Sequence, residues 1–100
     1  MENNQENMHK FEIEVPADVM GGHYSNFTVV VHSNSEFILD FAAMLPGSPK
    51  AKVKSRIIMT PENAKRLLYM LQENIAHYEK KNGTIKISNN RGPIIGGGFA

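Results

Sequence analysis

The chain has 100 residues, 41% of them hydrophobic, and its 11 basic and 10 acidic residues give a net charge of +1. This length suits one domain with one core, and the near balance of charge argues against bulk attraction to nucleic acid or anionic membranes. The absence of cysteine excludes disulfides, thiolate nucleophiles and cysteine metal sites. Without a membrane-length apolar run or a signal-peptide pattern, we expect a cytoplasmic protein that does not enter a membrane.

The N-terminal part of the chain is first polar and then alternating. Residues 1–9 lack apolar periodicity, so we expect a disordered arm. From Phe11 to Val15, apolar residues alternate with glutamates, which predicts a first, half-buried strand that ends at Pro16. Residues 18–22 then form a glycine-containing connection.

Three further strands are expected after this connection. Residues 24–32 are rich in β-branched and aromatic types and predict the second strand. Residues 33–35 form a short hairpin loop, and residues 36–45 predict the third strand because apolar side chains alternate within them. The sequence Pro46-Gly-Ser-Pro49 is a turn, and residues 51–59 predict the fourth strand.

A long helix is expected to follow the fourth strand. Thr60 can cap free N–H groups, and Pro61 suits the first helical position. Apolar residues then recur at helical spacing as far as Tyr78, and Gly83 provides the stop. Residues 84–87 are compatible with a short extra strand.

These elements predict an α+β fold: a four-stranded antiparallel meander with one long C-terminal helix packed on one face. The domain is expected over residues 10–87, and the Gly-rich residues 88–100 are expected to be a flexible tail. A short linear motif in that tail, anchored by Ile94, Ile95 and Phe99, is the alternative.

The apolar pattern also predicts the register of the hairpins. A first hairpin centred on Asn34 places Val29 opposite Leu39, and a second centred on Ser48 places Leu39 opposite Ile57. One sheet face then seats the apolar side of the helix. Its expected members are Phe27, Val29, Val31, Phe37, Leu39, Phe41, Val53, Ile57 and Met59.

The opposite face is the candidate interaction surface. In this register Val30, Ile38 and Ile58 form one purely apolar row. The next row contains Thr28, Asp40 and Arg56, with an ion pair between the last two, and Asn26, Ala42 and Lys54 form a third. One helix cannot cover both faces, so a homodimer contact is expected here. Binding of a different protein to this face is the alternative. Strand propensity alone is the competing explanation for these aliphatic residues.

Several segments together carry a resemblance to a known family. They include Tyr24-Ser-Asn26, Glu36-Phe-Ile-Leu-Asp40-Phe41, Val53-Lys-Ser-Arg56-Ile57 and Thr60-Pro-Glu-Asn-Ala64-Lys65-Arg66-Leu67. With these segments, residues 24–86 resemble domain-of-unknown-function family 3467, a group of small bacterial and archaeal proteins. The resemblance implies no activity, cofactor or catalytic residue. The order of strands and helix is also similar to that of the export chaperone SecB, a likeness of topology alone.

No catalytic or metal constellation emerges from the sequence. The four histidines lack metal-ligand spacing, the serines lack a nucleophile frame, and Asp40 has no second carboxylate beside it. We therefore expect a protein that is not an enzyme and needs no cofactor.

A basic strip has two interpretations. Lys52, Lys54 and Arg56 on the fourth strand lie near Lys65 and Arg66 at the helix start. These side chains suit phosphate or nucleic-acid contact, but charge on an edge strand also prevents aggregation. With a net charge of +1, we favour the second interpretation.

Three functional hypotheses remain from the sequence. We favour a homodimeric interaction or scaffold module without enzymatic activity. A nucleic-acid or phosphate-binding protein that uses the basic strip is one alternative, and a SecB-like chaperone is the other.

Overall fold

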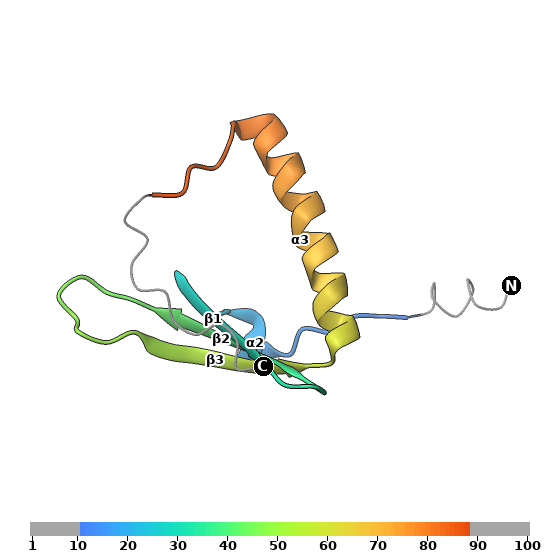
Figure 1. Ribbon diagram of the computed structural model, residues 1–100, viewed down its shortest axis with the longest axis horizontal. Coiled ribbons are helices and arrows are strands. Elements are labelled where there is room, and N and C mark those ends of the chain that lie inside the picture. The colour runs from blue at the N-terminus through green and yellow to red at the C-terminus, as the bar shows by residue number, and fades with distance from the viewer. Residues whose placement is uncertain (1–10, 89–100) are drawn as a thin grey trace, which may run out of the picture.

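A computed structural model describes residues 11–88, so the two expected tails, residues 1–9 and 88–100, lie outside the described residues except for residue 88. Strands β1 (Phe27–His32), β2 (Phe37–Ala43) and β3 (Lys52–Met59) form one antiparallel sheet in the order β1-β2-β3. Helix α3 (Pro61–Asn82) rises from the end of β3 on one side of this sheet (Figure 1). The predicted α+β class, antiparallel sheet and long C-terminal helix are confirmed.

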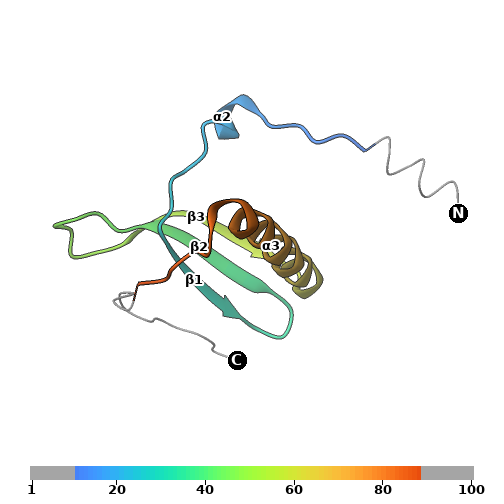
Figure 2. The same cartoon turned by 90° about the horizontal axis from the view of Figure 1, so that it is seen from above.

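The sheet has three strands, and the prediction of four is wrong. Residues 11–16 are extended without a strand partner, and a single short helix, α2 (Ala17–Met20), follows them. The segment runs away from the sheet in two perpendicular views (Figures 1 and 2). The likeness to SecB rested on four strands before the helix, so this topology does not support it.

The first hairpin has a longer loop than predicted, and this changes its register. Ser33 donates its backbone N–H to the carbonyl of Glu36 (2.9 Å), and its hydroxyl accepts from the N–H groups of Ser35 and Glu36 (3.3 Å each). These bonds take Glu36 into the loop, so His32 pairs with Phe37, and their rings stack 5.2 Å apart.

Every pairing predicted for β1 is therefore displaced by one residue. Val30, and not Val29, lies opposite Leu39. Because side chains alternate between faces, Val30 and Thr28 move to the side of the helix, while Val29 and Val31 move to the other side.

The second hairpin follows the predicted register until a bulge interrupts it. Leu39 pairs with Ile57 and Asp40 with Arg56, as expected. An irregularity between Phe41 and Ala42 then shifts the pairing, so Ala42 lies opposite Val53 and not Lys54. The turn itself closes with the Ser48 N–H donating to the Leu45 carbonyl (3.1 Å), and Gly47 adopts the positive φ of 82° that this turn requires.

Helix α3 begins and ends where its capping residues predict. The Thr60 hydroxyl accepts from the Asn63 N–H (3.1 Å), and Pro61 occupies the first turn. At the other end Gly83 has a φ of 92°, and its N–H donates to the Glu79 carbonyl (2.8 Å). The Glu79 carboxylate also accepts from the Ile85 N–H (2.9 Å), and this bond ties the segment after the helix to its last turn.

The buried core of the described chain is small. Only Leu39, Ala42 and Ala43 among residues 11–88 are buried hydrophobic residues, and all three lie on the central strand β2. Most of α3 stands clear of the sheet (Figure 1), and it contributes no fully buried side chain. The single chain therefore leaves many large apolar side chains exposed within residues 11–88.

Candidate interaction surface

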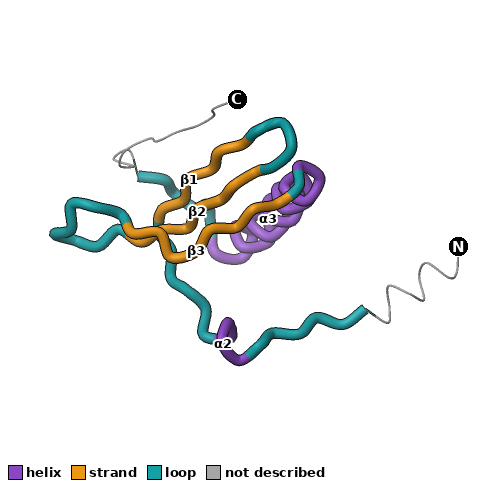
Figure 3. The backbone as a smooth tube through the Cα atoms, turned by 90° about the horizontal axis from the view of Figure 1, so that it is seen from below, coloured by secondary structure: helices purple, strands orange, loops and turns teal. Residues whose placement is uncertain are grey.

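The sheet face that points away from α3, called the second face below, is apolar and uncovered. Viewed from below, the sheet lies in front of α3, and no described helix crosses it (Figure 3). Strand pairing arranges its side chains in three rows. These rows are Val31–Ile38–Ile58, Val29–Asp40–Arg56 and Phe27–Ala42–Val53.

Exposure on the second face is highest at the edge strand β3. Ile58 is 58% exposed and Val53 is 50% exposed, while Ile38 and the β1 residues are half-buried by their neighbours. A solvated sheet face normally carries polar residues at these positions. Apolar rows across all three strands are instead typical of a surface that another protein covers.

The structure brings together four of the six residues predicted for the interface. Ile38, Ile58, Asp40 and Arg56 lie on the second face, whereas Val30 and Thr28 pair with Leu39 and Phe41 on the helix side. The sequence analysis missed Val53, which the bulge moves to this face, and also Phe27, Val29 and Val31, which the longer first loop moves. Ser33 was the available signal, because a serine at the start of a hairpin loop can recruit the residue three positions later into the turn.

Asp40 and Arg56 form the ion pair predicted for this face. Arg56 Nε donates to Asp40 Oδ1 at 2.7 Å, and its Nη2 donates to Oδ2 at 2.9 Å. The hydrogen bond from Arg56 lowers the pKa of Asp40; desolvation partly opposes this shift, and the positive charge of Arg56 adds to it. The bidentate geometry fixes the β2–β3 register and holds the Asp40 carboxylate charged.

A second apolar feature is a groove between the sheet and the first turns of α3. Its volume is about 430 Å³, and it remains open because the helix tilts away from the sheet (Figure 1). Leu68 and Leu71 are 46% and 50% exposed beside it. The lining residues are Val30, Phe37, Leu39, Pro61, Ala64, Lys65, Leu67, Leu68 and Leu71.

The model of one protein family, described as "Protein of unknown function (DUF3467)", matches residues 1–87. The chain belongs to this family. The resemblance seen in residues 24–86 is thus confirmed, and the DUF3467 match also includes the alternating segment from Phe11 to Val15. Neither a curated protein nor a solved structure matches the chain.

The basic strip of the DUF3467 chain is partly occupied by internal contacts. Arg56 is paired with Asp40, and Arg66 bonds Glu62 one helical turn away at 2.6 Å. Lys65 Nζ lies 5.9 Å from the centre of the Tyr69 ring. Lys52 and Lys54 have no such contact within residues 11–88, and they lie on the free edge of the sheet.

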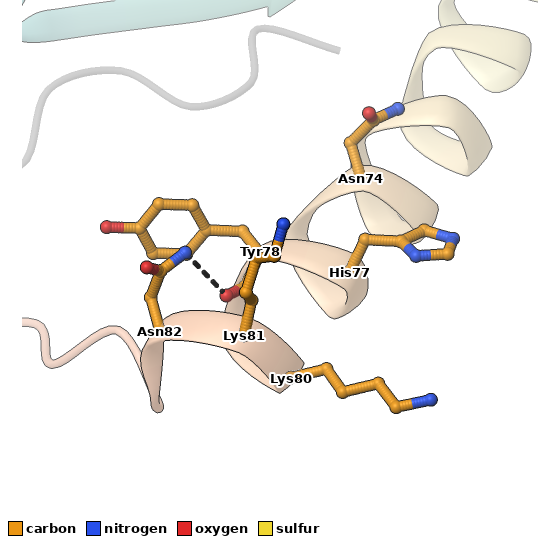
Figure 4. Close-up of a pocket in the computed structure, with 6 residues that line it drawn as sticks. All are labelled: Asn74, His77, Tyr78, Lys80, Lys81 and Asn82. Carbon is orange, nitrogen blue, oxygen red and sulfur yellow. Dashed lines mark hydrogen bonds between the residues drawn. The ribbon is translucent and has the colours of Figure 1, made fainter.

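No metal-ligating cluster accompanies these surfaces in the described part of the DUF3467 chain. Residues 11–88 contain no group of three or more His, Cys, Asp or Glu that could hold a metal ion. Among residues 11–88, the hollow of about 780 Å³ beside the end of α3 is lined by residues of that helix (Figure 4), where the Asn82 amide donates to the Tyr78 carbonyl. Over the same range, no helix has the length and apolar character of a membrane span.

Proposed function

We propose that this DUF3467 protein is a non-enzymatic interaction module that forms a homodimer through its second face. The observation that carries the proposal is the row Val31–Ile38–Ile58, which is apolar on all three strands and has no described helix over it. Burying large aliphatic side chains contributes about 1.5–3 kcal/mol each, so covering this row favours association.

The small core of the protomer supports the same proposal. A domain of this size buries only about 60–70% of its unfolded surface, and marginal domains of this kind are often completed by a second subunit. Here three residues of β2 are the buried hydrophobic residues of the described chain. A second copy on the sheet supplies the missing layer, with Asp40 and Arg56 kept as a neutral pair inside the contact.

A matched pair of variants tests the second face. Ile58→Asp places a charge on the exposed part of this face, and Ile87→Asp makes the same change at an exposed residue beyond α3. We expect sedimentation velocity at micromolar concentration to show a dimer for the native chain and for Ile87→Asp. The variant Ile58→Asp is expected to sediment as a folded monomer, because an unpaired buried carboxylate is strongly unfavourable.

Two results contradict the proposal. A native chain that sediments as a monomer at every concentration would remove the homodimer. A dimer that is equally stable in Ile58→Asp would place the contact elsewhere on the protomer.

A further inference from the structure

The segment from Phe11 to Val15, called the N-terminal strand segment below, has the pattern of a strand but no strand partner. Pro16 continues its extended conformation with φ −61° and ψ 155°. Phe11, Ile13 and Val15 are 74%, 83% and 54% exposed. Its apolar side chains and its backbone hydrogen-bonding groups therefore face solvent within the described chain.

An extended segment of this kind is completed by the edge of a sheet. Strand addition satisfies the main-chain groups, and alternate side chains determine which edge is chosen. The sheet offers two free edges, β1 and β3. They differ in charge, because β1 contains no Lys, Arg, Asp or Glu, while β3 contains Lys52, Lys54 and Arg56.

Charge complementarity selects β3. The N-terminal strand segment presents Glu12 and Glu14 between its apolar residues. Within residues 11–88, neither these glutamates nor Lys52 and Lys54 form an ion pair, although all four residues are exposed. Opposite charges across neighbouring strands stabilise pairing, and like charges weaken it.

The direction of the chain places the segment within reach of another molecule. The views from above and from below both show α2 and the residues before it outside the sheet, on the side of β3 (Figures 2 and 3). The segment leads away from its own β3 and does not pair with it. A second copy that meets this side of the protomer would find the segment projecting toward it.

The size of the second face points to an additional contact. Three strands about 4.8 Å apart, with a rise of about 3.3 Å per residue, cover roughly 300–400 Å². A stable interface buries about 800 Å² per partner. The sheet face alone therefore falls short, and a five-residue strand with Phe11, Ile13 and Val15 on one side supplies much of the difference.

We propose that the N-terminal strand segment of each protomer adds to the β3 edge of a second copy, with Glu12 and Glu14 beside Lys52 and Lys54 of the partner chain. This inference rests on the proposed homodimer and adds a reciprocal exchange of strands to it. In a two-fold dimer both segments make the same contact, so each protomer completes the sheet of the other.

Charge-reversed chains test the exchange without knowledge of the strand register. One variant carries Glu12→Lys and Glu14→Lys, and the other carries Lys52→Glu and Lys54→Glu. Alone, each variant brings like charges together and should form homodimers about tenfold more weakly or worse. Mixed, the two variants should form a 1:1 heterodimer of native affinity, since opposite charges then meet in both contacts.

A control with the same net charge separates this contact from general attraction. The pair Glu36→Lys and Glu73→Lys changes the net charge by the same amount at exposed sites outside the N-terminal strand segment. Mixed with the Lys52→Glu, Lys54→Glu chain, it should show no preference for the heterodimer, and circular dichroism should show that all variants fold. Sedimentation velocity of labelled chains at low salt measures each affinity, because salt screens these charges.

Each outcome decides a different question. If the two variants keep native homodimer affinity, or if mixing them restores nothing, the exchange is wrong and the homodimer stands. If the control pair prefers the heterodimer equally, net charge explains the result and the exchange is again wrong. If the native chain is a monomer, both the exchange and the proposed function are wrong.

Discussion

Leu39 is the one large side chain that the described protomer buries, at 7% exposure. It lies between Val30 on β1 and Ile57 on β3, on the helix side of the central strand. We expect Leu39→Ala to lower the free energy of unfolding by about 2–5 kcal/mol, because the removed methyl groups leave a cavity. Urea unfolding at fixed protein concentration measures the loss. Val30→Ala is the matched control, and since Val30 is 44% exposed, an equal or larger cost there would contradict this packing.

Asp40 gives the protomer a defined response to acid. Because Arg56 lowers the pKa of Asp40 in the folded chain, the unfolded chain binds the proton more tightly. The stabilising effect is complete above the ordinary aspartate pKa of about 4, and it is lost as the pH falls through the lowered folded value. Asp40→Asn should therefore show a flatter stability profile below pH 4 than the native chain, as measured by urea unfolding at several pH values. Glu73→Gln, at an exposed carboxylate without an ion pair in the described chain, should leave the native profile unchanged; a flattened profile in this control would mean that Asp40 is not the cause.

At the scale of the elements, the cap of α3 is the clearest local determinant. The Thr60 hydroxyl accepts from the Asn63 N–H, one of the free donors of the first turn. Thr60→Ala should cost about 1 kcal/mol of stability, and Thr60→Ser should restore most of it because serine keeps the acceptor. Thermal unfolding of the three chains compares them. Equal stability of the alanine and serine variants would show that the hydroxyl contributes nothing.

The elements also show how far sequence reasoning reaches. Alternation and β-branched composition predicted β1, β2 and β3, and Thr60-Pro61 with Gly83 predicted the bounds of α3, because these signals are local. Two errors came from effects that a pattern does not carry. The bonds to the Ser33 hydroxyl lengthened the first loop by one residue, and the bulge after Phe41 changed the pairing of Ala42. The first error also changed the predicted interface. Val30 lies on the helix side, and Val29 and Val31 lie on the second face in its place.

The third error concerns a partner and not a pattern. Phe11 to Val15 alternates as a strand should, yet no edge of its own sheet receives it. Periodicity indicates which side chains need cover, but it does not indicate which chain supplies the neighbouring strand. In the proposed exchange, β3 of a second copy is the missing partner. The segment can therefore have the sequence pattern of a strand without pairing in its own sheet.

The whole molecule is expected to gain stability from association. Because the buried core of the described chain is confined to β2, unfolding and dissociation should be linked. We expect the midpoint of thermal unfolding to rise steadily over about a hundredfold increase in protein concentration, and calorimetry measures this midpoint. The variant Ile58→Asp should show no such rise. A native midpoint independent of concentration would mean that the protomer is stable alone.

The three consecutive valines of β1 have a consequence for how this family can change. Either set of β1 side chains can serve as the inner one, since Val30 lies on one side of the strand and Val29 and Val31 on the other. Deleting a single residue from the loop at Ser33 would shift the β1–β2 register by one residue. Val30 would then exchange faces with Val29 and Val31, and both faces of β1 would stay apolar. A deletion of one residue would thus change which side chains of β1 lie on the proposed dimer surface. Relatives whose loops differ in length would then present different surfaces and would not form mixed dimers.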